Sequence, residues 1–346
     1  MIKISVVIAA YNAEKFIRKA VESAVHFQEV NEVVLVEDGS TDNTLNVCKQ
    51  LKEEYDKIKL YLHPNNINKG AGASWNLGIK NATCEYITFL GADDYYLSNR
   101  FDAEKGIFYH NADADGVYGA LGVHYYSNDG KDKFKKRFSR ELTTVNKVIP
   151  PAELKYILLD MSKTYMGYFS LNSLTVKKSL VEKIGYFNEK LRLHQDSVLI
   201  VKLAFLGTLV PGSIKVPVAI RGVHDGNRIT SSDHDYNSEF LQYFELEKWM
   251  DLNIIGEEKA KRCIRKERLV YQLLKKDGNK LFKISELIRL FINEPYLFYV
   301  DRDFNRLIKS VFGNILPVKV SVRLKKMMFH VILRKRINKW NDYLYH

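Results

Sequence analysis

The chain has 346 residues, 46% of them hydrophobic and 27% charged, which suggests about two folded domains and excludes a disordered or fibrous protein. Its formal net charge is +12, and most of the excess lies after residue 235, where 23 Lys and Arg face 13 Asp and Glu. The sequence has neither a recognisable signal peptide nor an apolar run of about 20 residues, so we expect a cytoplasmic protein without a membrane span.

Strand and helix patterns alternate over the first hundred residues. Apolar, β-branched runs predict strands at Ser5 to Ala9, Glu32 to Val36, Ile58 to Leu62 and Tyr86 to Leu90. Stretches with helical spacing lie between them. Strands that are apolar on both faces and are joined by helices indicate a parallel sheet that is covered on both sides.

Polar residues before two of these helices are candidate caps. Asn12 precedes the apolar positions that begin at Phe16, and Thr41 or Asp42 precedes Leu45. Short polar side chains satisfy the free N–H groups of a first helical turn. We therefore expect Asn12 to cap the first helix, and Thr41 or Asp42 to cap the second.

The pattern is less regular between residues 107 and 235. Strands are expected near Gly116 to Tyr126 and near Ser173 to Val176, with a charged loop at Lys131 to Arg140. That loop is either a solvated segment or one that closes over an anionic substrate. A helix is expected from Asp196 to Gly207, because its apolar residues keep helical spacing.

Strand patterns end near residue 235. Helices are expected at Ser238 to Leu252, Glu257 to Lys276, Ile284 to Asn293 and Val318 to Trp340. We therefore predict two domains, residues 1–235 and a basic, mainly helical domain at 236–346. The last helix is basic and amphipathic, so it either lies on an anionic membrane surface, such as the inner face of the plasma membrane, or packs on the first domain.

Six segments, in order, resemble the family 2 glycosyltransferases of the bacterial surface-polysaccharide type. They are SVVIAAYNAEKFIRKAVESA, VVLVEDGSTDNT, NKGAGASWNLGI, YITFLGADD, KIGYFNEKLRLHQDSVLIVKLAFLG and AIRGVHDGNRIT. The resemblance covers about residues 3–230. It implies a GT-A fold, which is an α/β, Rossmann-like, mixed but mainly parallel sheet flanked by helices. It also implies inverting transfer of a hexosyl or N-acetylhexosaminyl group from a nucleotide sugar, expected to be a UDP-sugar.

The resemblance places a donor site at the carboxyl ends of the strands, where α/β sheets bind ligands. It implies that Asp38 and Tyr11 hold the uridine while Ala9 leaves room beside the base. It also assigns donor contacts to Gly70, Asn76, Ala92, Asp93, Asp94 and Arg221. The plainer alternatives are a turn residue for Asp38 and a packed aromatic ring for Tyr11.

Two adjacent carboxylates, Asp93 and Asp94, follow the fourth strand. Neighbouring like charges are costly unless a cation neutralises them, so the pair predicts a Mn²⁺ or Mg²⁺ site. The resemblance implies Asp93 as the ligand, and Gly91 stands where the family usually has another Asp. His224 is a second candidate ligand, and an imidazole nitrogen suits Mn²⁺ better than Mg²⁺. The alternatives are an exposed acidic turn and a structural histidine.

Asp196 matches the family's catalytic base, and Gln195 replaces the Glu that usually precedes it. Asp196 is also placed to cap the following helix, and one carboxylate can serve both purposes. Trp75 stands where the family commonly has Arg, so it either stacks on a ligand or packs internally. Arg228, on a later loop, is expected either to neutralise the departing diphosphate or to be solvated.

We expect the partners to be a nucleotide-sugar donor and a glycan or lipid-linked acceptor. Nucleic acid is not expected, because no nucleic-acid motif accompanies the basic tail. Two other functions stay open. One is a sugar-phosphate nucleotidyltransferase, although the first strand lacks its glycine-rich loop. The other is a catalytically impaired binder of nucleotide sugars or membranes, since Gly91, Trp75 and Gln195 depart from the family pattern.

Overall fold

The computed structural model describes residues 2–162, 164–227, 235–274, 285 and 289. The chain divides between Asp233 and His234 into two compact units. The two helices expected last in the sequence, Ile284 to Asn293 and Val318 to Trp340, lie outside the described residues except for Ser285 and Arg289.

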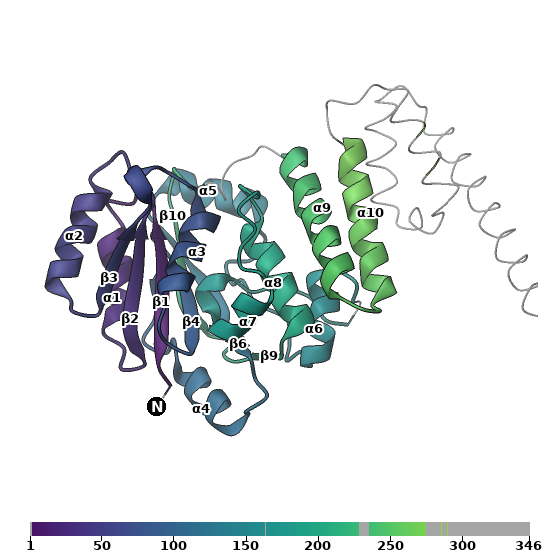
Figure 1. Ribbon diagram of the computed structural model, residues 1–346, viewed down its shortest axis with the longest axis horizontal. Helices are drawn as coiled ribbons and strands as arrows, with labels where there is room; N and C mark the ends of the chain where they lie inside the picture. Colours follow the sequence, from purple (N-terminus) through teal and green to yellow (C-terminus); the bar gives the residue numbers. More distant parts are fainter. Residues whose placement is uncertain (1, 163, 228–234, 275–284, 286–288, 290–346) are drawn as a thin grey trace, which may run out of the picture. The chain divides into compact units, whose positions relative to one another are not determined.

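A seven-stranded sheet forms the centre of the first unit, within the described part of the chain (Figure 1). In spatial order its strands are β3 (Ile58–Leu62), β2 (Val30–Glu37), β1 (Ile4–Ala10), β4 (Tyr86–Gly91), β8 (Leu174–Lys177), β6 (Gly116–Tyr118) and β9 (Leu209–Pro211). Strands β3, β2, β1 and β4 are parallel to one another, whereas β8 is antiparallel to β4 and β6. The fold class and the first four predicted strands are confirmed.

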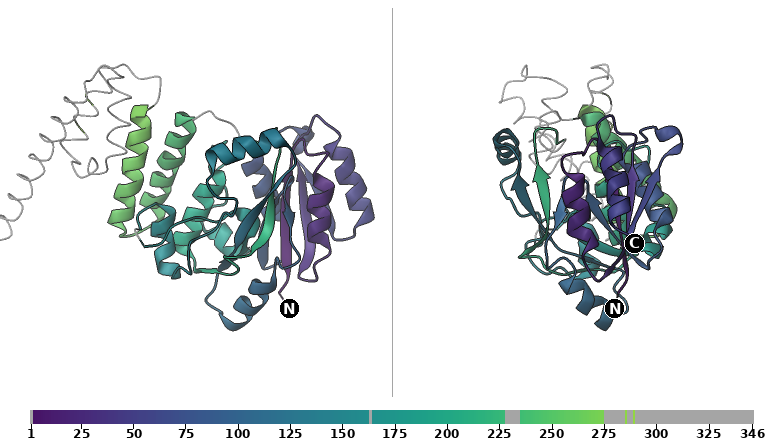
Figure 2. Two further views of the ribbon diagram at one scale, coloured as in Figure 1. Left: turned by 180° about the vertical axis from the view of Figure 1, so that it is seen from behind. Right: turned by 90° about the vertical axis from the view of Figure 1, so that its left-hand side faces the viewer.

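Helices cover both faces of this sheet (Figures 1 and 2). Helices α1 (Ile17–Val25) and α2 (Thr44–Glu54) share a core with Val6 and Ile8 of β1. Helix α3 (Ala71–Asn81) packs on the opposite face, where Gly78 meets Val7. Successive side chains of a strand point to opposite faces, so a strand covered on both sides is mostly apolar on both.

A smaller sheet, β5-β10-β7, lies beside the large one. Its strands are β5 (Tyr95–Tyr96), β10 (Pro217–Val223) and β7 (Ala120–Tyr125). The remaining helices of the first unit are α4 (Asp102–His110), α5 (Asn128–Arg137), α6 (Pro151–Leu158), α7 (Lys178–Lys183) and α8 (Gln195–Leu206). The helix expected from Asp196 is therefore confirmed as α8.

The charged loop expected at Lys131 to Arg140 is wrong for most of its length, because residues 128–137 form helix α5. Ser127 caps the helix, since its Oγ accepts a hydrogen bond from Gly130 N at 3.0 Å. Phe134, only 1% exposed, anchors it to the body of the unit. The helix has so few apolar residues that its sequence shows no helical periodicity.

The expected cap at Asn12 is also wrong. Helix α1 begins at Ile17, and Asn12 instead accepts a hydrogen bond at Oδ1 from Thr41 N at 2.8 Å. Asn12 thereby ties the end of β1 to the loop before α2. Helix α2 begins at Thr44, and the Oδ1 of Asp42 accepts from Thr44 N at 3.0 Å. The N-cap position of α2 is Asn43, so the cap expected at Thr41 or Asp42 is also wrong, although Asp42 does accept from the first N–H of the helix.

The second unit contains α9 (Tyr236–Asn253) and α10 (Glu258–Leu274), which match two predicted helices. Glu247 of α9 accepts hydrogen bonds from the guanidinium groups of Arg265 and Arg268 of α10. Tyr243 and Tyr271 stack with their ring centroids 5.6 Å apart. Among the described residues, none of the helices is both long and apolar enough to cross a membrane.

Gly78→Ala should destabilise the protein. A Cβ at this position would lie 2.2 Å from Val7 Cγ1, so α3 would have to move away from the sheet. We expect a loss of about 1–3 kcal/mol in the free energy of unfolding, measured by urea denaturation. Gly106→Ala in α4 is the matched control, because its Cβ would meet no atom within 4 Å. Equal stability of the two variants would contradict this packing.

Candidate active site

Polar residues gather where β1, β2 and β4 end, because these parallel strands finish at the same edge of the sheet. Ala9 of β1 is paired with Gly91 of β4. Asp38 N donates to Ala10 O at 2.9 Å, which holds the end of β2 against the end of β1. Tyr11 follows β1 with 48% of its surface exposed. Ala9, Tyr11 and Asp38, which the sequence predicted at strand ends, therefore lie at the same edge of the sheet.

Asp38 is buried and organises the loop before α3. Its Oδ1 accepts from Lys69 N at 2.7 Å, and its Oδ2 accepts from Gly70 N at 2.9 Å and Asn68 Nδ2 at 3.1 Å. Gly70 has φ +88°, a conformation that glycine adopts without strain. Asp38 thus holds this loop beside the strand ends, and its predicted contact with a nucleotide stays a prediction.

The segment before α8 is fastened to α3. Asn76 is buried; its Nδ2 donates to Phe187 O at 3.0 Å and to Glu189 Oε1 at 2.8 Å, and its Oδ1 accepts from Phe187 N at 2.9 Å. Asn76 therefore acts here as a link between two chain segments. Gln195 is also buried, and a Cβ added to Gly72 would lie 3.2 Å from its Oε1. These contacts bring the start of α8 beside the start of α3.

Asp196, in the first turn of α8, is exposed. Its Oδ1 accepts a hydrogen bond from Ser197 N at 2.9 Å. The N-cap position of α8 is His194, and Asp196 is the second residue of the helix. The expected alternative role of Asp196 as N-cap is thus wrong, and its carboxylate faces solvent at the edge of the site.

Trp75 packs internally. Its ring stacks on Phe187 with centroids 6.1 Å apart, and it meets Phe89 edge-on at 5.3 Å. Phe89 belongs to β4, two residues before Gly91, so this aromatic cluster supports the strand that carries the acidic pair. These contacts agree with the internal packing that the sequence left as one alternative for this partly buried ring.

Asp94 is turned into the protein. Its Oδ2 accepts from Asn172 Nδ2 at 2.5 Å, and its Oδ1 accepts from Gly222 N at 2.8 Å. Asn172 also accepts from Gly91 N at 3.0 Å. Burial and the charge of Asp93 raise the pKa of Asp94 to about 7, whereas Arg221 and the two donors favour its ionised form. Sequence reasoning missed Asn172, because this contact spans 78 residues.

Two glycines permit this compact turn. A Cβ on Gly91 would lie 2.4 Å from Asp94 Oδ2, and a Cβ on Gly222 would lie 2.0 Å from the carbonyl oxygen of Asp93. The carboxylate of Asp94 therefore lies against the backbone of Gly91, where the family resemblance would imply an Asp. A larger residue at position 91 would have to displace it.

Asp93 points the other way and its side chain is 33% exposed. Its Oδ2 accepts from Asn227 Nδ2 at 2.8 Å and lies 3.3 Å from His224 Nε2. Gly226 N donates to His224 Nδ1 at 3.2 Å, so the neutral imidazole carries its proton on Nε2 and donates it to Asp93. Phe16 stacks on the imidazole with centroids 4.5 Å apart, which fixes the orientation of the ring.

The outward pair, Asp93 and His224, fits a divalent cation in part. A carboxylate oxygen and an imidazole nitrogen are both ligands for Mn²⁺. In the described part of the chain, however, three or more His, Cys, Asp or Glu never gather in a way that could hold a metal. Most of the coordination would thus come from phosphate oxygens and water, as is common for such ions. Coordination through Nε2 also requires its proton to move to Nδ1, at the cost of the Gly226 bond.

The remaining predicted residues are placed as follows. Ala92 is buried within the turn, and Arg221 lies on β10, close enough to lower the pKa of Asp94 by its charge. Arg228 lies outside the described residues. Asn227 and Gly222 were not predicted as site residues, although both belong to the quoted segment AIRGVHDGNRIT.

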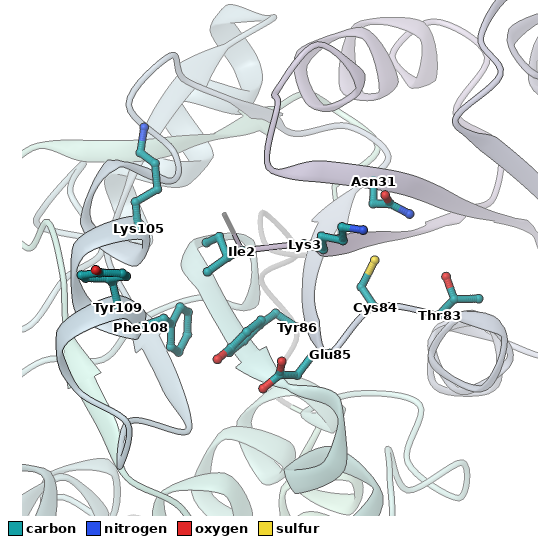
Figure 3. A pocket seen from close by; sticks show the side chains of 10 residues that line it. All are labelled: Ile2, Lys3, Asn31, Thr83, Cys84, Glu85, Tyr86, Lys105, Phe108 and Tyr109. Carbon is teal, nitrogen blue, oxygen red and sulfur yellow. The ribbon is translucent and has the colours of Figure 1, made fainter.

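A pocket of about 890 Å³ lies elsewhere, at the amino ends of β1 and β4 (Figure 3). It is lined partly by Ile2, Cys84 and an aromatic group of Tyr86, Phe108 and Tyr109. Tyr86 and Phe108 have ring centroids 4.2 Å apart. None of the predicted site residues lines this pocket, so it is separate from the carboxyl edge of the sheet.

Comparison with known proteins identifies the first unit. Residues 5–171, just under half of the chain, match the family described as Glycosyl transferase family 2. The first unit therefore contains a domain of this family. A fragment of TarS from S. aureus, solved in complex with UDP-GlcNAc, has the same fold: the TM-score is 0.59 at 20% identity, over 90% of this chain and 82% of that one.

Curated relatives are bacterial. An uncharacterized glycosyltransferase of Nostoc sp. is 28% identical over 66% of this chain and 67% of its own length. The minor teichoic acid biosynthesis protein GgaA of Bacillus subtilis is 25% identical over 58% of this chain and 42% of its own. The Escherichia coli protein WfaP is 30% identical over 36% of this chain and 47% of its own length. Its name describes it as a UDP-Glc:alpha-D-GlcNAc-diphosphoundecaprenol beta-1,3-glucosyltransferase. The chain thus spans less than half of the latter two proteins.

Asn172→Ala should loosen the acidic turn. The change leaves Asp94 Oδ2 and Gly91 N without their partner in a buried place. We expect a loss of about 2–4 kcal/mol in the free energy of unfolding, measured by urea denaturation. Asn46→Ala is the matched control; Asn46 is exposed on α2, so its loss should cost no more than about 0.5 kcal/mol. A loss at Asn172 as small as that would contradict the role given to its side chain.

Proposed function

We propose that this protein is a metal-dependent, inverting glycosyltransferase that moves a sugar from a UDP-sugar to an acceptor hydroxyl in the synthesis of a bacterial polysaccharide. The observation that carries the proposal is the arrangement at the carboxyl edge of the sheet. Asp93 faces outward beside His224, Asp38 orders the neighbouring loop, and Asp196 is exposed at the start of α8.

The donor would lie across the ends of β1, β2 and β4. Tyr11, which is half exposed, offers a ring on which the base can stack, next to Asp38 at the end of β2. The diphosphate would lie toward Asp93 and Arg221. UDP as the nucleotide is supported by TarS, solved with UDP-GlcNAc, and by WfaP, whose name states UDP-Glc as its donor.

Asp93, with His224, would hold the cation, and a bound divalent ion supplies charge neutralisation for a departing diphosphate. Asp94 would not bind the cation directly, because it is buried and its two oxygens accept hydrogen bonds from Asn172 and Gly222. When ionised, Asp94 would add a negative charge behind Asp93 and so strengthen the attraction of a cation to the turn.

Asp196 would accept the proton of the acceptor hydroxyl as its oxygen attacks the anomeric carbon. The bond from that carbon to the diphosphate oxygen breaks on the opposite face, so one displacement inverts the configuration. The exposed carboxylate of Asp196 supports this role, as does its place next to Gln195, whose Oε1 would lie 3.2 Å from a Cβ on Gly72 at the start of α3. Release of UDP rather than of pyrophosphate would separate this reaction from a nucleotidyltransferase.

Asp93→Asn should weaken binding of a UDP-sugar in the presence of Mn²⁺ without lowering stability, because Asp93 is partly exposed. Loss of a residue that only supports a metal ligand costs about 10- to 100-fold in affinity, and we expect at least this for Asp93. Calorimetric titration of the UDP-sugar, with and without Mn²⁺, measures this affinity. Asp56→Asn, on the surface after α2, is the matched control. Unchanged Mn²⁺-dependent binding in Asp93→Asn would remove this residue from the metal site.

Asp196→Asn should lower the turnover number by on the order of 10²- to 10⁴-fold, the usual contribution of a general base. Donor affinity should stay within about twofold of the original, because the amide keeps the size and polarity of the carboxylate. Steady-state kinetics and donor titration measure the two quantities. Near-normal turnover would exclude Asp196 as the base.

A further inference from the structure

Helix α5 carries a dense positive charge beside the candidate active site. Residues 128–140 contain six Lys and Arg and two Asp. Lys133, Lys135, Lys136 and Arg140 are all exposed. Lys133 pairs with Asp129 at 2.6 Å and Lys135 with Glu141 at 3.4 Å, whereas Lys136 and Arg140 make no ion pair with the described residues. The segment therefore keeps a net positive surface.

This helix is attached to the loop that holds Asp93. Ser127 Oγ, which caps α5, also donates to Asp225 Oδ1 at 2.5 Å. A Cβ added to Gly130 would lie 3.3 Å from His224 Cα, so the first turn of α5 contacts the backbone of the candidate metal ligand. Figure 1 shows α5 beside the end of β10 that leads into this loop. The basic helix thus starts at the site and leads away from it.

The apolar side of α5 is already used. Phe134 is 1% exposed, and its ring lies 4.7 Å from Phe138 and 5.9 Å from Tyr125 between centroids. A helix that inserts into a membrane surface needs a free apolar face. Helix α5 offers solvent its charged face only, which suits a water-soluble polyanion better than a lipid bilayer.

We propose that α5 and the residues just after it, up to Arg140, are the docking surface for a phosphate-bearing acceptor polymer. Its phosphodiester groups bind along Lys135, Lys136 and Arg140, while its terminal hydroxyl reaches the site past His224. This inference rests on the proposed glycosyl transfer and names the chemistry of its acceptor. It requires a chain of repeated negative charges, because exposed cations hold single phosphates weakly in salt.

The test measures binding of poly(glycerol phosphate) to the full-length protein over a series of salt concentrations. The triple variant K135Q, K136Q, R140Q should lose about tenfold or more in affinity at low salt, with a shallower salt dependence. The control variant K49Q, K52Q, K183Q removes the same charge from exposed positions on α2 and α7. It should bind within about twofold of the unchanged protein, since its substitutions lie off the docking surface.

Neutral dextran, single-stranded RNA and vesicles containing phosphatidylglycerol serve as comparison ligands. Equal losses in the two triple variants would overturn the proposal, because net charge alone would then explain binding. RNA or vesicle binding that depends on α5, with polymer binding that does not, would overturn it as well. Titration with a UDP-sugar separates the docking proposal for α5 from the proposed transferase function. If the α5 variant binds the donor normally but not the polymer, docking is supported, whereas failure of every variant to bind any UDP-sugar would count against the transferase function alone.

Discussion

The arrangement of the site depends on one buried carboxylate. Asp94 lies inside the turn after β4, where water cannot solvate it, so its charge must be balanced by protein groups. Asn172 and Gly222 donate to its two oxygens, and Arg221 adds a positive charge nearby. With Asp94 held inward, the preceding Asp93 is left facing out. The two like charges thereby take different places, one buried and held by the protein and one partly exposed as a candidate ligand.

This constraint reaches three distant parts of the chain. Asn172 precedes β8 and Gly222 belongs to β10, so the central strand β4 is tied to both sheets at the turn. Glycine is needed at positions 91 and 222 because the carboxylate and the carbonyl oxygen of the turn occupy the space of a Cβ. The glycine at 91 is therefore a packing requirement of this particular turn rather than a simple loss of an acidic residue.

The strands could be predicted from sequence because each is a local run of apolar residues whose burial needs no knowledge of its partners. Helix α5 was missed because Phe134 is the only large apolar residue within it, and Phe138 follows directly after its end. The cap at Asn12 was misassigned because its partner, Thr41, lies 29 residues away. For the same reason the residues alone indicated Asp93 and Asp94 together as a metal site. The resemblance implied Asp93 as the ligand, but the sequence did not show that Asp94 faces inward. That distinction comes from Asn172 and Gly222, which are remote in sequence.

A crystal structure of the protein with Mn²⁺ and UDP tests the central claim most directly, because anomalous scattering locates the metal independently of the protein. We expect one Mn²⁺ peak at coordination distance from Asp93 Oδ2 and from the diphosphate, with Asp94 still bound to Asn172 and Gly222. A metal coordinated by Asp94, or UDP bound at this edge of the sheet with no metal beside Asp93, would contradict the division of roles between the two carboxylates.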